Sequence, residues 1–274
     1  MASPSMFVEK LRAAQQTNNT HLCIGLDPDL ERMAHPHIPS FFADIINETK
    51  DLVCAYKPNF AFFEALGLEG MQIMLEALRA VPKHIPIIAD AKRGDIGNTA
   101  RFYARTIFDI YKFDACTVNP YGGRDAVQPF IEYRDKGVIV WCRSSNEGAA
   151  DLQDLQLADG RAVYEAIAEQ ARAWNTSGNV GVVAGATWPR QIERVREICP
   201  DQVLLVPGVG EQEGELEAAV EAAMDVRGSG FIINASRAVL YASRGDDYAA
   251  AARKQAQHLR NRINMMREAA LARG

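Results

Sequence analysis

Short apolar segments recur along the chain, and most are followed by a longer stretch with the spacing of an amphipathic helix. In residues 98–112, for example, Phe102, Thr106 and Ile110 recur every four positions, which places them on one helix face. Residues 161–174 and 247–272 show the same kind of pattern. The segments predicted as strands are 21–26, 52–57, 85–90, 115–119, 138–142, 180–184, 203–206 and 231–234.

Strands that alternate with helices predict a parallel α/β sheet, because each helix returns the chain to the same end of the sheet. Eight such units within 274 residues fit a closed (β/α)₈ TIM barrel better than an open doubly wound sheet. No low-complexity linker interrupts the pattern. We therefore expect a single barrel domain over residues 1–274.

Composition narrows the class of protein without adding a function. The chain is 48% hydrophobic and 24% charged, and its net charge of −5 gives no reason to expect a nucleic acid partner. The five cysteines form no CxxC pair, and four lie in apolar runs, so we expect buried thiols in a reducing compartment. With no signal core and no membrane-length apolar run, the prediction is a cytoplasmic protein.

The candidate chemistry lies where the predicted strands end. In a barrel of this kind the reactive groups gather at the carboxyl ends of the strands. The first three strands lead into Asp27, Lys57 and Asp90, and Lys92 shares a face with Asp90 because alternate residues of an extended chain point the same way. A surface salt bridge would explain one such pair, but charges on three neighbouring strands indicate a functional site.

A phosphate site is predicted after the seventh and eighth strands. Gly208 and Gly210 would let backbone N–H groups approach an anion, at the place where such barrels commonly bind phosphate. Gln212 and Arg237 can add hydrogen bonds to the phosphate oxygens.

At this point the motifs match a known family. The segment from Asp90 to Thr99, Asp-Ala-Lys-Arg-Gly-Asp-Ile-Gly-Asn-Thr, resembles the DxKxxDIxxT signature of orotidine 5′-phosphate decarboxylases. The segment 57–64 (Lys-Pro-Asn-Phe-Ala-Phe-Phe-Glu) and the Asn-Pro-Tyr block at 119–121 are similar to the longer bacterial branch, type 2. The likeness extends from Gly25 to Arg237.

The resemblance implies a homodimeric barrel that converts orotidine 5′-phosphate to UMP and CO₂ in pyrimidine biosynthesis, with neither a metal nor an organic cofactor. It makes Lys92 the proton donor in a charged array, and it gives Asp27 to the ribose and Ser145 to the pyrimidine. The array comprises Lys57, Asp90, Lys92 and Asp95. The residues that reach the neighbouring subunit's site are Asp95, Ile96 and Thr99, and the phosphate grip is Gly208, Gly210, Gln212 and Arg237. The sequence departs from the branch at Gly122 and Ala126, where a bulky residue and a serine are usual.

Three other functions remain as alternatives. A metal-dependent sugar-phosphate decarboxylase or synthase of the same superfamily resembles the DxKxxD core, but it has a carboxylate at the end of strand two, where this chain has Lys57. A Schiff-base aldolase would need an uncharged lysine, which flanking carboxylates disfavour. A non-catalytic sensor of a phosphorylated ligand would need the anion grip but not the charged array.

Overall fold

The computed structural model describes residues 5–208 and 213–273, with the backbone alone for 213–215. Eight parallel strands form one sheet in the order β2-β1-β8-β7-β6-β5-β4-β3, and two bridges, Tyr56 to Ile87 and Asn59 to Asp90, join β2 to β3. The barrel prediction is therefore confirmed. The strands are β1 (Leu22–Leu26), β2 (Ala55–Pro58), β3 (Ile88–Arg93), β4 (Ala115–Val118), β5 (Gly137–Arg143), β6 (Val180–Ala184), β7 (Leu204–Pro207) and β8 (Phe231–Ala235).

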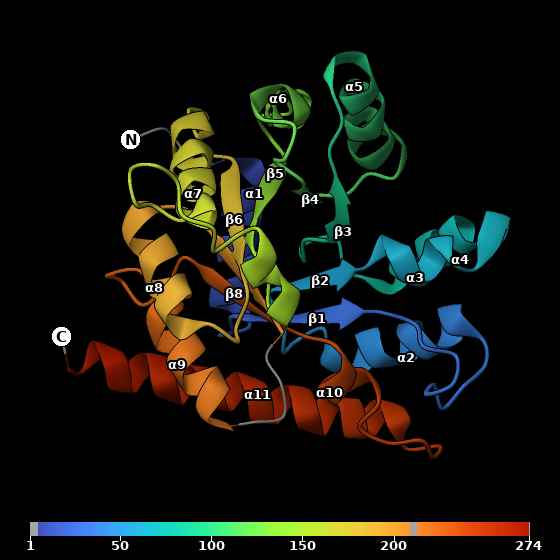
Figure 1. Ribbon diagram of the computed structural model, residues 1–274. Helices are drawn as coiled ribbons and strands as arrows, with labels where there is room; N and C mark the ends of the chain where they lie inside the picture. Colours follow the sequence, from blue (N-terminus) through green and yellow to red (C-terminus); the bar gives the residue numbers. More distant parts are fainter. Residues whose placement is uncertain (1–4, 209–212, 274) are drawn as a thin grey trace.

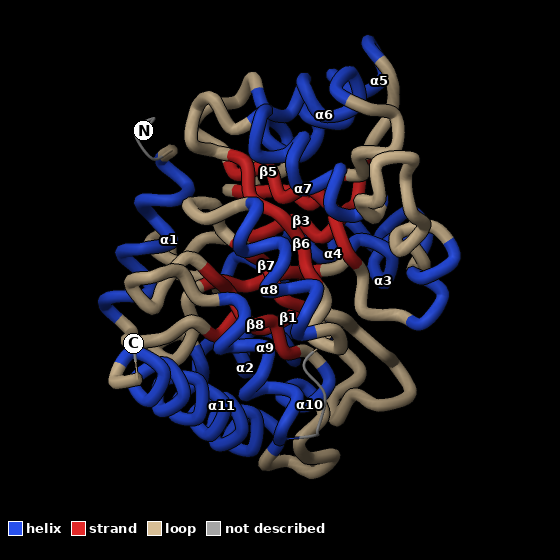
Figure 2. Tube along the Cα trace, turned by 60° about the vertical axis from the view of Figure 1, so that its left-hand side comes forward, coloured by secondary structure: helices blue, strands red, loops and turns tan. Residues whose placement is uncertain are grey.

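Helices surround the sheet, as the blue tubes around the red strands of Figure 2 show. In Figure 1 α11 runs along one side of the barrel, and α5 and α6 project at the top. The helices are α1 (Met6–Thr17), α2 (Ile38–Thr49), α3 (Phe60–Glu64), α4 (Gly70–Ala77), α5 (Gly97–Arg105), α6 (Arg124–Ile131), α7 (Val163–Trp174), α8 (Pro189–Ile198), α9 (Glu213–Ala223), α10 (Arg237–Leu240) and α11 (Tyr248–Leu271). Single helical turns are η1 (Gly67–Glu69), η2 (Leu78–Ala80), η3 (Thr106–Ile110) and η4 (Glu147–Asp151).

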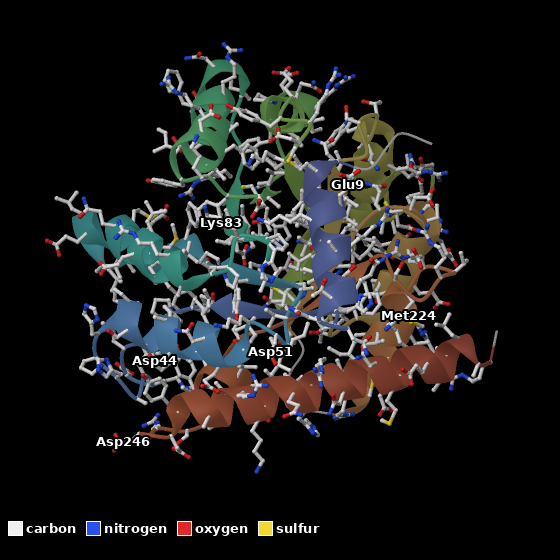
Figure 3. The ribbon with its side chains drawn as sticks, turned by 180° about the vertical axis from the view of Figure 1, so that it is seen from behind. Glu9, Asp44, Asp51, Lys83, Met224 and Asp246 are labelled. Atoms are coloured by element: carbon white, nitrogen blue, oxygen red, sulfur yellow. The ribbon has the colours of Figure 1, made fainter. Side chains whose placement is uncertain are left out.

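Alternation along each strand divides the apolar residues between two clusters. On β1, Leu22, Ile24 and Leu26 pack with the surrounding helices, whereas Cys23 belongs to the cluster that fills the barrel. The same inner cluster contains Phe7 of α1, which is 3% exposed. Figure 3, seen from behind, shows α1 with Glu9 lying across the barrel. α1 therefore packs against the amino-terminal end of the barrel, opposite the end at which the strands finish.

The boundaries differ from the sequence prediction mainly beside the charged residues. The third strand was predicted over 85–90 but extends over Ile88–Arg93, so Lys92 lies within it and not after it. The helix predicted over 98–112 is α5 followed by a single π turn, η3, that ends at Ile110. The five cysteines are all buried and unpaired, as expected.

Two further features concern the outer layer. Arg253 of α11 forms a bidentate ion pair with Asp51, which follows α2, at 2.7 and 2.9 Å, and Figure 3 shows Asp51 beside α11. This exposed pair joins the longest helix to the segment that follows α2. Among the described helices, none combines the length and the apolar character that a bilayer crossing requires.

Protonation of His21, just before β1, should lower the stability of the fold in acid. Its ring stacks on Phe231 at 4.4 Å, and burial lowers its pKa to about 4, so it is neutral in the fold near pH 5 but protonated when unfolded. The free energy of unfolding should therefore fall as the pH drops from about 6.5 to about 4, by roughly 3 kcal/mol at most. Urea unfolding of the wild type and His21→Asn across this range measures the difference. His84→Asn, on an exposed loop, should keep the wild-type slope; an equal slope in His21→Asn would contradict the assignment.

Candidate functional site

Four of the predicted site residues, Asp27, Lys57, Asp90 and Lys92, lie in a layer directly above the inner apolar cluster, together with Asn234, which was not predicted. Counting by twos from Cys23, Ala55, Ile88 and Ile232, all inner residues, leads to Asp27, Lys57, Asp90 with Lys92, and Asn234. The same alternation along the strands that directs apolar side chains into the lower part of the barrel therefore directs polar side chains inward at its carboxyl end.

Asp90 is the centre of this layer. Its two carboxylate oxygens each accept a hydrogen bond from a lysine ammonium group, Oδ2 from Lys57 and Oδ1 from Lys92, and both distances are 2.6 Å. Lys57 is 3% exposed and Asp90 9%, whereas the Lys92 side chain is 36% exposed. Lys92 is thus the member of the array that a ligand can reach.

Asp90 and Lys57 keep their charges despite their burial. Burial would raise the pKa of Asp90, but the ammonium groups of Lys57 and Lys92 hold it well below its usual range. Burial likewise opposes the charge of Lys57, yet Asp90 and then Asp27 raise the pKa of this amine above its ordinary value. A carboxylate between two cations, in a site closed from below, creates a strong and fixed local field.

The backbone at Lys92 is held in an uncommon conformation. Its φ is +44°, in the left-handed region that residues with a side chain rarely adopt. The Lys92 N–H donates to Oγ1 of Thr117 at 3.0 Å, and that hydroxyl donates to Oδ1 of Asp90 at 3.0 Å. Thr117, buried on β4, thus joins the lysine backbone to the carboxylate. The sequence prediction missed it because one threonine in an apolar strand resembles any core residue.

Asp95, Ile96 and Thr99 lie apart from the array. Within the described residues, Asp95 makes no hydrogen bond or ion pair with Lys57, Asp90 or Lys92, and its Oδ1 instead accepts from the Ile96 N–H at 2.7 Å. Ile96 is 68% exposed, and Thr99 is exposed on the first turn of α5. The structure therefore brings together three of the four predicted charged residues and leaves the fourth, the half-buried Asp95, out of this cluster.

The predicted phosphate grip is described only in part. Gly208 follows β7 with a φ of +85°, and a Cβ there would lie 2.9 Å from the Ser145 Oγ. The loop after β7 therefore meets the loop after β5 at Ser145, and this contact requires a glycine. Arg237 begins α10, is exposed, and pairs with no carboxylate of the described chain. Gly210 and Gln212 lie outside the described residues.

A buried arginine fixes the segment that follows Ser145. Arg143, 1% exposed at the end of β5, binds both oxygens of Asp154 at 3.0 and 2.9 Å and donates to the Ser144 carbonyl at 2.7 Å. Gln153 accepts from the Ser144 N–H at 2.8 Å. The residues before and after η4 are thus tied together next to Ser145.

Replacing Arg143 tests whether this tie positions Ser145. Arg143→Met should cost roughly 2 kcal/mol of unfolding free energy, because it removes the buried partner of Asp154, a carboxylate that is 34% exposed. It should also raise KM for orotidine 5′-phosphate, the substrate that the sequence resemblance implies, several-fold with little change in kcat, since Ser145 would be held less firmly. Arg161→Met, which removes exposed pairs with Asp159 and Glu169, is the matched control and should change both values little. An unchanged KM in Arg143→Met would show that Ser145 needs no such support.

Asp27 completes the layer on β1. Its Oδ1 is buried without a hydrogen-bond partner, although burial normally demands one.

The sequence departs from the family branch at Gly122 and Ala126. Ala126 is buried, and a Cβ at Gly122 would approach the Ala126 Cβ to 3.0 Å. The two small residues thus lie against each other, and a Cβ at Gly122 would also lie 3.9 Å from the Ile96 Cγ2.

The fold and this charged layer define an enzyme of the α/β-barrel class. The sequence profile of the "Orotidine 5′-phosphate decarboxylase / HUMPS family" matches residues 20–254. A curated orotidine 5′-phosphate decarboxylase of Roseiflexus sp. (strain RS-1) is 50% identical over 266 residues, which are 94% of this chain and 97% of the relative. Another, from Ralstonia nicotianae, is 49% identical over 269 residues, covering 95% and 99%.

Solved structures agree. The structure of Leishmania donovani OMP decarboxylase superposes with a TM-score of 0.85 and 42% sequence identity, over 96% of this chain and 99% of that one. The chain therefore belongs to the orotidine 5′-phosphate decarboxylase / HUMPS family.

Proposed function

We propose that this protein converts orotidine 5′-phosphate to UMP and CO₂, the last step in making UMP. The observation that carries the proposal is the Asp90 carboxylate held between Lys57 and Lys92, with only Lys92 open to a ligand. Sequence identity of about one half to curated orotidine 5′-phosphate decarboxylases, over nearly the whole chain, supports the same reaction.

Lys92 supplies the central step of this mechanism. Loss of CO₂ leaves an electron pair on the ring carbon, and an ammonium group stabilises that carbanion before giving it a proton. The charge develops only along the reaction, so the attraction is stronger in the transition state than in the ground state. A proton passes from the Lys92 Nζ to the ring carbon, and the amine is reprotonated from solvent.

Asp90 acts mainly by positioning. A carboxylate close to the substrate carboxylate would repel it, by roughly 4 kcal/mol at 4 Å and an effective dielectric near 20. In this site both oxygens of Asp90 are already bound to ammonium groups, which reduces that repulsion. We therefore rank carbanion stabilisation above ground-state repulsion.

Remote contacts hold the substrate over the array. We assign Arg237 and Gly208, with Gly210 and Gln212, to the phosphate, Asp27 to the ribose and Ser145 to the pyrimidine. The contact between Gly208 and Ser145 supports this arrangement, because it brings the phosphate loop and the pyrimidine loop to one place. Binding energy from the phosphate would then hold the ring against Lys92.

A homodimer completes the site in this proposal. The surface around the Asp95 turn exposes apolar side chains that a soluble monomer would normally cover. These residues are Ile96, Phe102, Ile110 and Tyr121, between 58% and 92% exposed. Nearby, Arg93 pairs with Glu64 and lies over the rings of Phe60 and Tyr103, which fixes the turn. A second copy docked here would receive Asp95, Ile96 and Thr99 in its own site.

We also place the chain in the longer bacterial branch of the family, because segments 57–64 and 119–121 resemble that branch.

Lys57 separates this function from its alternatives. A metal-dependent relative would need a carboxylate at the end of β2, and the buried ammonium group there would repel a divalent cation. Because the pKa of Lys57 is raised, the amine stays protonated and is a poor Schiff-base nucleophile.

The test is to add orotidine 5′-phosphate in the presence of a chelator and follow its loss by absorbance. We expect full turnover with UMP as the product. Turnover that stops with the chelator and returns with Mg²⁺ would favour the metal-dependent alternative, and binding without any product would favour a sensor.

A further inference from the structure

Asn234 lies in the site layer, on the inner face at the end of β8. It is 6% exposed, pairs in register with Cys23 of β1 and Pro207 of β7, and comes two residues after Ile232 of the inner apolar cluster. Its position is therefore between the ribose residue Asp27 and the phosphate loop that begins at Gly208.

The side-chain amide of Asn234 does little for the fold. Its Nδ2 makes one long hydrogen bond, 3.4 Å to the Ser236 Oγ, and its Oδ1 is buried with no partner. Among the described residues, three other amides, those of Asn179, Gln202 and Asn264, also have a buried oxygen without a partner, but their nitrogens donate to backbone carbonyls at 3.3 Å or less. Asn179 donates to three backbone carbonyls, and Gln202 donates to two. Those amides hold loops together, whereas Asn234 binds only a neighbouring side chain.

A second unpartnered acceptor lies on the adjacent strand. The Oδ1 of Asp27 is also buried without a partner. A Cβ on Gly25 would lie 1.9 Å from the Ser236 Oγ and 3.2 Å from the Asp27 Oδ2, so both oxygens border the space above Gly25. Asn234, Ser236 and Asp27 thus form one polar group across β8 and β1.

A buried oxygen that no protein group satisfies carries a cost in the empty protein, and a ligand that supplies a donor removes that cost. We propose that Asn234 is a further substrate-binding residue, whose Oδ1 accepts a hydrogen bond from a hydroxyl of the substrate's sugar. This inference rests on the proposed function, because the sugar is that of orotidine 5′-phosphate and UMP. One sugar hydroxyl donates to the Asn234 Oδ1, and the adjacent sugar hydroxyl donates to the Asp27 carboxylate.

Asn234→Leu tests the proposal by replacing the amide with an apolar group of similar size. The inhibition constant of UMP should rise roughly 10- to 100-fold, since one sugar hydroxyl loses its acceptor and is left buried. The thermal midpoint of the empty protein should stay the same or increase, because an unsatisfied buried oxygen has been removed. Asn234→Asp, which keeps an acceptor at this position, should bind UMP more tightly than Asn234→Leu does.

Deoxynucleotides identify the hydroxyl. The wild type should bind UMP more tightly than 2′-deoxy-UMP or 3′-deoxy-UMP, and Asn234→Leu should lose that discrimination at one of the two positions. Asn264→Leu removes another unpartnered amide oxygen, on α11, and should leave the UMP inhibition constant unchanged. Unchanged discrimination at both positions in Asn234→Leu, or a lower thermal midpoint with unchanged UMP binding, would overturn the inference. Turnover of orotidine 5′-phosphate by the wild type separates that failure from failure of the proposed function.

Discussion

Lys92→Ala should abolish decarboxylation and leave the fold intact. Removing the proton donor and the cation that faces the carbanion should lower kcat by at least about 10⁴-fold, which combines a general-acid contribution with an electrostatic one. The fold should survive because Asp90 keeps its buried partner Lys57 and its bond from Thr117. Single-turnover measurements on orotidine 5′-phosphate, with urea unfolding of the same preparation, give both results.

The chain offers a close control for this substitution. Lys112 also has a positive φ, +62°, and it is exposed on the loop before β4. Lys112→Ala makes the same substitution at a residue with positive φ, but outside the site, and should keep the wild-type kcat. If Lys92→Ala retains kcat within tenfold of the wild type, Lys92 is not the proton donor.

Two inactive variants should restore activity when they share a dimer. Lys92→Ala removes a group from its own subunit's site, whereas Asp95→Asn is proposed to damage the site of its partner. A mixed dimer then holds one doubly damaged site and one intact site. After refolding of an equal mixture, half of the dimers are mixed, so activity should return to about a quarter of the wild-type value per subunit.

The result separates a shared site from a self-contained one. In a mixture of Lys92→Ala and Asp90→Asn, each substitution damages the site of the subunit that carries it, so no site is intact and no activity should return. Recovery should also depend on the apolar surface around Ile96, so Ile96→Asp should weaken dimer formation in sedimentation velocity. No recovery from Lys92→Ala with Asp95→Asn would place Asp95 in its own subunit's site.

Charged residues of the site could be predicted from sequence because each follows a strand that the apolar pattern reveals. Alternation alone put Asp90 and Lys92 on one face, and the 2.6 Å hydrogen bond from Lys92 to Asp90 confirms it. Thr117 and Asn234 could not be found this way, since an uncharged polar side chain within a strand is common in any core. The pairing of Arg143 with Asp154 depends on how residues 144–154 fold back, and that path leaves no periodic signal.

The sequence by itself determined the barrel, the layer of charges at its carboxyl end and the family, because these depend on local periodicity and on motifs of fixed spacing. Only the tertiary structure decided which charges meet. It bound both oxygens of Asp90 to lysines, left Lys92 accessible, and placed Asp95 outside the array. It also revealed the unsatisfied oxygens of Asp27 and Asn234. The physical reason is that pKa values, burial and hydrogen-bond satisfaction depend on neighbours distant in sequence, which only the closed barrel brings within a few ångströms.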